Sequence, residues 1–180
     1  MPKADSETAC AVIRPGSRAD LPELAKLWES TTQPDGQFLL RRYFDDVASG
    51  VQKMLVGEVD GRIKGQIWIR FRGSDPKFSD DRIQCYLHTL FVHPDSRRQG
   101  MGLALVLGAS RLAREQGRSE LVIAVDQPNR YARALYGKWG FAQFAHLVDL
   151  RGDLILMSRA VFGPEEARRL IDKTHIEFFS

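Results

Sequence analysis

A glycine-rich turn near the middle of the chain carries the residues best suited to chemistry. It comprises Arg97, Arg98, Gln99, Gly100, Met101 and Gly102, between an apolar run (87–92) and a long amphipathic segment (103–118). This order predicts a strand, a tight turn and then a helix. The first N–H groups of a helix lack partners within it, and the positive end of the helix dipole lies beside them. The turn therefore predicts a site that binds a pyrophosphate group.

The spacing of the glycines narrows the choice of ligand. Gly100 and Gly102 are separated by one residue, but no third glycine completes a dinucleotide-binding motif and no Gly-Lys-Ser/Thr completes a P-loop. The turn instead resembles the Arg/Gln-x-x-Gly-x-Gly/Ala loop of the GCN5-related N-acetyltransferases (GNAT), with Arg97, Gly100 and Gly102 at the three specified positions. This resemblance implies that the turn binds the pyrophosphate of acetyl-coenzyme A (acetyl-CoA).

A second segment is similar to the other signature of this family. That signature reads Asn-x-x-Ala-x-x-Leu-Tyr with Gly-Phe four residues later, and the matching residues here are Asn129, Ala132, Leu135, Tyr136, Gly140 and Phe141. The glycine turn alone is equally compatible with a helix start that binds nothing. The presence of both motifs in the family's order favours the resemblance over that alternative.

The hydrophobic pattern predicts an α/β fold with a mixed sheet. Strands are expected at 10–14, 53–59, 62–71, 84–92, 121–125, 141–150 and 153–160, and helices near 20–28 and at 37–49, 101–116 and 129–139. Asp60-Gly61 predicts a type I′ hairpin between two of these strands. A helix separates the strands at 84–92 and 121–125, which predicts a central parallel pair joined by a right-handed crossover. About seven strands and four helices in this order resemble the GNAT fold.

A single domain is expected over residues 1–180, because 180 residues with 43% hydrophobic content suit one core. The GNAT resemblance covers about residues 10–160. Beyond it, 163–180 predicts a C-terminal helical extension, since Gly163 and Pro164 begin a helix with acidic residues in its first turn. The extension either docks against the sheet edge or contributes, with Phe178 and Phe179, to a homodimer contact.

Composition excludes several classes of protein. A net charge of +3 arises from 26 basic and 23 acidic residues that are dispersed along the chain, so no nucleic-acid partner is expected. The N-terminus is polar and no run of about 18 apolar residues occurs, which favours a cytoplasmic protein without a membrane partner. Cys10 and Cys85 form no C-x-x-C pair, which favours a reducing compartment and predicts no metal site.

The resemblance also implies how the cofactor is held. In GNAT enzymes two strands splay apart after a bulge, and the pantetheine lies in the gap against the backbone of the first strand, which corresponds here to Leu90, Phe91 and Val92. The N–H of Val92 or Phe91 is then the donor toward the thioester carbonyl. The N–H groups of 99–102 bind the pyrophosphate, while the side chains of Arg97 and Arg98 either reinforce these contacts or remain in water.

Tyr136 is the proton donor that the resemblance implies. It follows Asn129 by seven residues, nearly two helical turns, so both side chains can face the same cleft. An ordinary tyrosine pKa of about 10 keeps the hydroxyl protonated at neutral pH and able to protonate the coenzyme A thiolate. Asn129 is expected beside the pantetheine, although an asparagine before a helix caps it whether or not a ligand binds.

The general base is where the chain departs from the commonest family pattern. Glutamate is absent from both usual positions, which hold His88 and Ala124. His88 resembles a fourth-strand histidine of the arylalkylamine N-acetyltransferases, and it is either the base, directly or through water, or a polar wall of the cleft. Strand alternation predicts Tyr86, His88 and Leu90 on one face and Cys85, Leu87 and Thr89 on the other, which disfavours a Cys85–His88 nucleophilic pair.

These features predict an acetyl-CoA-dependent N-acetyltransferase that acts by direct attack of a primary amine in a ternary complex. The amine belongs to a small molecule or a peptide, and aromatic side chains are candidate walls of its site, namely Trp28, Phe38, Tyr43, Trp68 and Tyr86. The alternative is a coenzyme A-binding regulatory module without catalytic activity, which the missing glutamate allows. Tyr136 favours the enzyme, because a module that only binds needs no proton donor there.

Overall fold

The computed structural model describes residues 11–29, 36–150, 152–174 and 176–178. Eight strands form one sheet in the order β6-β7-β5-β4-β3-β2-β1-β8. Their bounds are β1 (Ala11–Pro15), β2 (Gln52–Val59), β3 (Arg62–Arg70), β4 (Gln84–Val92), β5 (Glu120–Asp126), β6 (Ala142–Asp149), β7 (Gly152–Ala160) and β8 (Ile176–Phe178). All neighbours are antiparallel except β4 with β5 and β1 with β8. The expected mixed sheet with a central parallel pair is confirmed.

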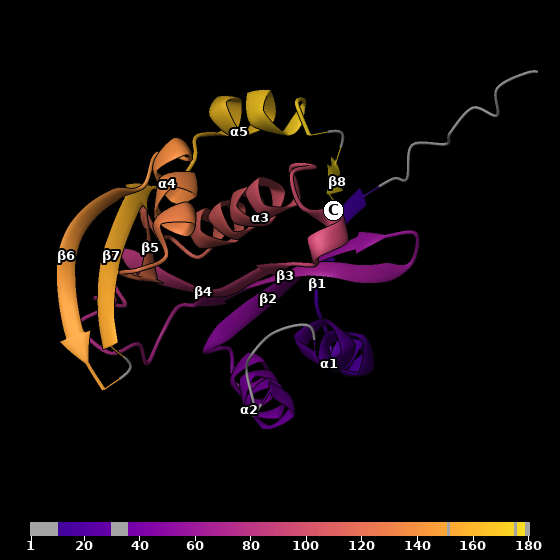
Figure 1. The fold of residues 1–180 in the computed structure, drawn as a ribbon, viewed down its shortest axis with the longest axis horizontal. Coiled ribbons are helices and arrows are strands. Elements are labelled where there is room, and N and C mark those ends of the chain that lie inside the picture. Colours follow the sequence, from indigo (N-terminus) through magenta and orange to yellow (C-terminus); the bar gives the residue numbers. More distant parts are fainter. Residues whose placement is uncertain (1–10, 30–35, 151, 175, 179–180) are drawn as a thin grey trace, which may run out of the picture.

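The helices cover both faces of this sheet. They are α1 (Leu21–Glu29), α2 (Gly36–Ala48), α3 (Met101–Glu115), α4 (Arg130–Lys138) and α5 (Pro164–Ile171), with short 3₁₀ turns η1 (Arg18–Asp20) and η2 (Pro94–Ser96). Helices α1 and α2 lie on one face and α3 and α4 on the other, with α5 outside α3 (Figure 1). The predicted four helices and C-terminal helix are confirmed, with ends that differ by one or two residues from the sequence pattern.

The hairpin between β2 and β3 forms as its sequence predicts. Asp60 and Gly61 have φ angles of 50° and 74°, and a type I′ turn requires positive φ at both central residues. The hairpin pairs β2 with β3, and β3 is in turn the direct neighbour of β4. Two strands that lie close in sequence thus form the floor beside β4.

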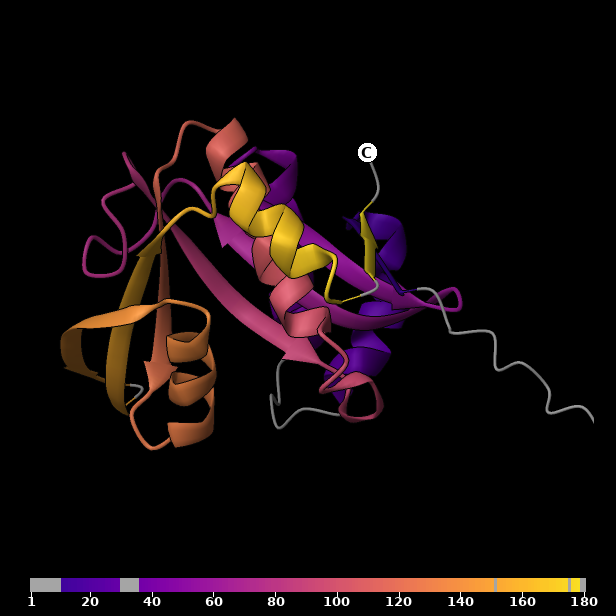
Figure 2. The same ribbon diagram turned by 90° about the horizontal axis from the view of Figure 1, so that it is seen from above.

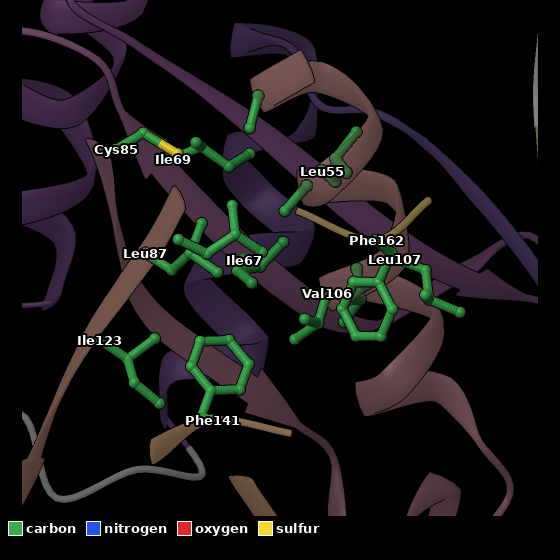
Figure 3. Close-up of a cluster of buried hydrophobic side chains, with 14 of the residues drawn as sticks. Leu55, Ile67, Ile69, Cys85, Leu87, Val106, Leu107, Ile123, Phe141 and Phe162 are labelled. Atoms are coloured by element: carbon green, nitrogen blue, oxygen red, sulfur yellow. The ribbon is translucent and has the colours of Figure 1, made fainter. Parts of the chain in front are cut away.

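The main core lies between the sheet and α3. Buried side chains from strands and helix interdigitate there, and Leu55, Ile67, Leu87, Val106 and Ile123 illustrate the packing (Figure 3). Glycines let α3 approach the sheet at its N-terminal end, since a Cβ on either Gly57 or Gly65 would lie 2.8 Å from Sδ of Met101. The first turn of α3 is therefore held tightly against β2 and β3, which fixes the position of the glycine-rich turn that precedes it.

The C-terminal extension docks on the same molecule. Helix α5 crosses over α3 (Figure 2), and the N–H of Phe162 donates to Ser110 Oγ of α3 at 2.7 Å. The chain then returns to the sheet, where β8 pairs with β1 in parallel. This strand is absent from the sequence prediction, because three residues carry too little pattern and the pairing joins opposite ends of the chain. Phe178 belongs to β8, whereas Phe179 and Cys10 lie outside the described residues.

Candidate active site

The glycine-rich turn presents a row of open backbone amides. No hydrogen-bond acceptor within the described chain faces the N–H groups from Arg98 to Leu103, and Ala104 is the first to bond back, to Gly100 O at 2.9 Å. Arg98 and Gly100 have positive φ angles of 63° and 86°, which turns successive amides toward one side. Together with the N-terminus of α3, this arrangement places open N–H groups at the positive end of the helix dipole, which suits an anion.

The two arginines of the turn behave differently. The Nε of Arg97 donates to Val92 O at 2.9 Å, and its guanidinium lies 5.7 Å from the ring centre of Phe91. Arg97 therefore ties the turn to the end of β4. The exposed Arg98 makes no hydrogen bond or ion pair with the rest of the described chain, so its charge remains available to an anion at the turn.

Both glycines of the turn are in close contact with distant segments. A Cβ on Gly100 would lie 2.9 Å from Cβ and Cγ2 of Thr174, which follows α5. A Cβ on Gly102 would lie 3.2 Å from the ring of Trp139, at the end of α4. The turn is thus held between the C-terminal extension and α4. Only glycine fits at position 100 without displacing Thr174, whereas a Cβ at position 102 needs only a small shift of Trp139.

A bulge in β4 opens the sheet beside this turn. Trp68 of β3 pairs with His88 while Gln66 pairs with Phe91, so Thr89 and Leu90 together oppose one residue of β3. Thr89 has a φ of 52°, in a region that β-branched residues rarely adopt. Because of the bulge, Leu90 packs against the core on the α3 side, whereas His88 lies on the opposite face of the sheet. The regular alternation expected from the sequence, with both residues on one face, is therefore wrong beyond Thr89.

Just before the bulge β4 and β5 separate. Their pairing ends at Leu87 with Ile123, and β5 continues along β7 alone (Figure 2). The edge of β4 that faces β5 is consequently unpaired from His88 to Val92 within the described residues. A small cavity of about 40 Å³ lies at the separation, lined by Ile67, Leu87, His88, Thr89, Leu90, Val106, Ile123, Ala124 and Tyr136.

Tyr136 reaches this cavity from α4. Its ring packs edge-on against Trp139 and Phe141, with centroids 5.5 and 5.7 Å away. Burial, with a smaller contribution from Tyr86, raises the pKa of Tyr136 to about 12. The hydroxyl therefore stays protonated throughout the neutral range and can donate a proton. Asn129 caps α4 through Oδ1, which accepts from Ala132 N at 3.0 Å.

His88 lies in a cluster of aromatic rings under α2. It stacks on Tyr86 and Trp68 and meets Tyr43 edge-on, at centroid distances of 5.7, 6.4 and 5.1 Å. Its Nε2 is 3.0 Å from Gln52 Oε1 and its Nδ1 is 3.0 Å from Thr89 Oγ1. Burial, with a smaller repulsion from Arg70, lowers the pKa of His88 to about 3.

The depressed pKa of His88 predicts that mild acid weakens the fold. The unfolded histidine takes up a proton near its ordinary pKa of about 6.5, whereas the folded ring resists protonation until near pH 3. The contribution of the neutral His88 ring to the free energy of unfolding is therefore fully present above pH 6.5. This contribution is lost as the pH falls toward 3. Because His88 as a whole residue is only half-buried, we expect a loss of about 1 to 2 kcal/mol between pH 7.5 and 5, less than the full linkage slope. Urea unfolding at the two pH values measures it.

The matched variant for this stability experiment is His88→Gln, which keeps a polar side chain without a titrating group. Its unfolding free energy should change less between pH 7.5 and 5 than that of the parent protein. If both proteins lose the same amount, His88 does not cause the acid sensitivity.

The rest of the predicted acceptor site is partly described. Tyr43 contacts Trp28 and Trp68 at centroid distances of 6.4 and 5.0 Å, which brings three of the predicted aromatic walls together. The side chain of Phe38 lies outside the described residues. Beneath the same helices Gln66 is 1% exposed, and neither of its amide atoms has a hydrogen-bond partner among the residues described.

Two residues of the site have no clear signal in the sequence. Thr89 appears as an ordinary strand residue, and only the bulge turns its hydroxyl toward His88. Gln52 is fully buried at the start of β2 and donates from Nε2 to Tyr43 O at 3.0 Å. Because Lys53 and Glu58 of the same strand are also polar, the residue type of Gln52 gives no hint that it is buried beside His88.

Other chemistries receive no support from the described part of the chain. Cys85 is buried and burial raises the pKa of its thiol to about 12, which makes it a poor nucleophile. Within the described ranges no three His, Cys, Asp or Glu side chains gather as a metal site would require. No described helix is both long and apolar enough to cross a membrane.

Comparisons with curated proteins point to one family of enzymes. Over 87 residues the chain is 30% identical to a mycothiol acetyltransferase of Saccharomonospora viridis, and over 67 residues it is 40% identical to human N-acetyltransferase 8. These alignments cover 48% and 37% of this chain but only 28% and 29% of the two relatives. The chain thus spans under a third of the length of these curated relatives.

Solved structures share the fold. A putative GNAT acetyltransferase from Desulfovibrio desulfuricans matches with a TM-score of 0.73 and 18% identity, over 85% of this chain and 100% of that one. A putative acetyltransferase from Salmonella typhimurium, solved with acetyl-CoA, matches with a TM-score of 0.69 and 18% identity, over 85% and 95% of the two chains. The family model described as the acetyltransferase (GNAT) family matches residues 21–141, which include the bulge, the glycine-rich turn and Tyr136. This chain belongs to the GNAT acetyltransferase family.

Proposed function

We propose that the chain is an acetyl-CoA-dependent N-acetyltransferase that acetylates a primary amine of a small molecule or peptide by direct attack in a ternary complex. One observation carries this proposal. The open amides from Arg98 to Leu103 lie at the end of β4, and the unpaired edge of that strand leads to a cavity that Tyr136 lines. A row of open amides, an unpaired strand edge and a cavity lined by Tyr136 thus follow one another, as pyrophosphate, pantetheine and thioester would require.

The described residues fit acetyl-CoA, which supplies an acetyl group activated as a thioester. The N–H groups of 99–102 would bind the pyrophosphate, with Arg98 as an added charge. The backbone of Leu90, Phe91 and Val92 would hold the pantetheine as a further strand does, and the N–H of Val92 or Phe91 would donate to the thioester carbonyl oxygen. Arg97 supports the turn through Val92 O, and Asn129 is proposed beside the pantetheine.

Proton transfer falls to residues of the cavity. Tyr136 would protonate the leaving sulfur, since its hydroxyl keeps its proton at neutral pH. His88 is the base candidate that the sequence offers, and its low pKa makes it weak in that role. The acceptor would enter from the side of α1 and α2, where Tyr43, Trp68 and the unpartnered amide of Gln66 lie.

Two measurements on the full chain test this proposal. Isothermal titration should detect binding of acetyl-CoA, and thiol release with a panel of amines should detect transfer to at least one of them. The panel includes peptides with free N-termini, polyamines, arylalkylamines and aminoglycosides. Binding without release across the panel would support a coenzyme A-binding module in place of an enzyme, and absence of binding would overturn both assignments.

A further inference from the structure

The hydrogen bonds around His88 have a fixed direction. Gln52 donates from Nε2 to the carbonyl oxygen of Tyr43 at 3.0 Å, which leaves its Oε1 to act as an acceptor. His88 Nε2, 3.0 Å from that oxygen, must therefore carry the proton. A neutral imidazole with a proton on Nε2 has a lone pair on Nδ1. Thr89 Oγ1, 3.0 Å from Nδ1, must be the donor of the last bond in this chain.

This direction determines what Thr89 can offer to a substrate. Its hydroxyl proton is committed to His88 Nδ1, so the oxygen presents lone pairs, and no proton, to its other neighbours. Thr89 lines the same cavity as Tyr136. Its φ of 52° costs free energy in a β-branched residue, and such strain persists where the surrounding structure enforces it, often at functional sites.

Among the residues that the structure describes, the charged and titratable groups around the Gln52–His88–Thr89 hydrogen bonds provide no strong base. The residues that line the cavity include no carboxylate. Arg70 of β3 repels a protonated His88 ring and is itself paired with Asp46 of α2. The other titratable neighbours within the described ranges are the phenols of Tyr43, Tyr86 and Tyr136. Both ring nitrogens of His88 are already engaged, and burial keeps the ring neutral.

We propose that Thr89 Oγ1 accepts a hydrogen bond from the neutral acceptor amine, that His88 is a positioning residue for Thr89, and that the enzyme therefore favours weakly basic α-amino groups. This inference rests on the acetyltransferase function proposed above. As the amine nitrogen bonds to the acetyl carbon the C–S bond breaks, and the sulfur takes the proton of Tyr136. The surplus proton on nitrogen leaves to water, and Tyr136 regains a proton from water.

The preference follows from the population of neutral amine. An α-amino group with a pKa near 7.8 is neutral in roughly one molecule of seven at pH 7, whereas a lysine amine with a pKa near 10.4 is neutral in about one of 2,500. Without a base to take the proton, this difference appears directly in the rate. The expected discrimination is about 350-fold at pH 7.

The test of substrate class uses one peptide that carries both a free N-terminal α-amine and a lysine. With acetyl-CoA as donor, mass spectrometry should find the acetyl group on the N-terminus, with lysine modified at about 1/350 of that rate. The kcat/KM should rise with pH along the pKa of the α-amine. Preferential lysine acetylation at pH 7 would overturn the inference.

The role of Thr89 as a hydrogen-bond acceptor is tested with the variant Thr89→Val, and Thr89→Ser is the matched control. Valine keeps the branching and the strain but removes the oxygen, so kcat/KM for the amine should fall about 10- to 100-fold while titration shows unchanged acetyl-CoA affinity. Serine should restore most of the activity. For His88→Gln, kcat/KM should fall less and its pH profile should keep the parent shape. Full activity of Thr89→Val, or a pH inflection that His88→Gln abolishes, would contradict these roles.

A readout independent of activity separates this inference from the proposed function. The ¹⁵N spectrum of the imidazole nitrogens, assigned by comparison with His88→Gln, should show a neutral ring with its proton on Nε2 from pH 7 down to pH 5. A proton on Nδ1, or a charged ring at pH 6, would overturn the hydrogen-bond direction even if the protein acetylates amines. Conversely, absence of transfer to every amine would overturn the proposed function and, with it, the substrate preference.

Discussion

Replacement of Gly100 by alanine should weaken acetyl-CoA binding about ten-fold or more. Gly100 has a φ of 86°, and a Cβ there would lie 2.9 Å from Cβ and Cγ2 of Thr174. A left-handed backbone costs a non-glycine residue roughly 1–2 kcal/mol, and the contact with Thr174 adds to that cost. The turn must shift to relieve both, which moves the amides that would bind the pyrophosphate. A change of about 1.4 kcal/mol in binding corresponds to a factor of ten.

The matched control for Gly100→Ala is Gly117→Ala. Gly117 follows α3, has a φ of 70°, and an added Cβ there meets nothing within 4 Å. Both variants carry the same kind of backbone strain, so thermal unfolding should detect a loss in each. Titration should show weaker acetyl-CoA binding in Gly100→Ala alone. Equal acetyl-CoA affinity of the two variants would remove the turn from the binding site.

Replacement of Tyr136 by phenylalanine should lower kcat about 100-fold and leave acetyl-CoA affinity unchanged. The substitution removes only the hydroxyl, which we propose protonates the leaving sulfur, and general acid catalysis typically contributes 10²- to 10⁴-fold. Because the pKa of Tyr136 is raised to about 12, the parent enzyme should not lose this proton as pH rises from 7 to 10. Steady-state kinetics and titration on the same preparations measure both effects.

Two controls distinguish catalysis from packing at this position. Tyr131→Phe lies on the same helix with a side chain 68% exposed, and it should behave as the parent protein. An acetyl donor with an aryl thiol, whose thiolate leaves without a proton, should narrow the gap between Tyr136→Phe and the parent. If the variant loses as much activity with that donor, or binds acetyl-CoA more weakly, Tyr136 acts by shaping the cavity.

Much of the fold follows from local pattern. The alternating segments on either side of Asp60-Gly61 predict a hairpin, and the positive φ angles of both residues are found in the structure. The apolar stripe of α3 between two strands predicts a parallel crossover, and β4 pairs with β5 as expected. These features depend on residues that are neighbours in sequence, so their periodicity and turn chemistry are visible without the structure.

The bulge marks the limit of this reasoning. Strand alternation predicts Leu90 on the same face as His88, but the extra residue at Thr89 reverses the faces that follow. Nothing in the local sequence specifies the bulge, because Thr89 and Leu90 are residue types that also occur in regularly paired strands. Its position results from packing against β3 on one side and from the separation of β5 on the other.

The sequence by itself determined the family motifs, the order of the elements, and the residue types of the turn and of Tyr136. Tertiary structure alone decided that Thr174 packs on Gly100, that β8 pairs with β1, and that Gln52, 36 residues from His88, sets the direction of its hydrogen bonds. The physical reason is the range of the interactions. A turn or a helix is stabilised by neighbours a few residues away, whereas a buried hydrogen bond between distant segments forms only after the chain has folded.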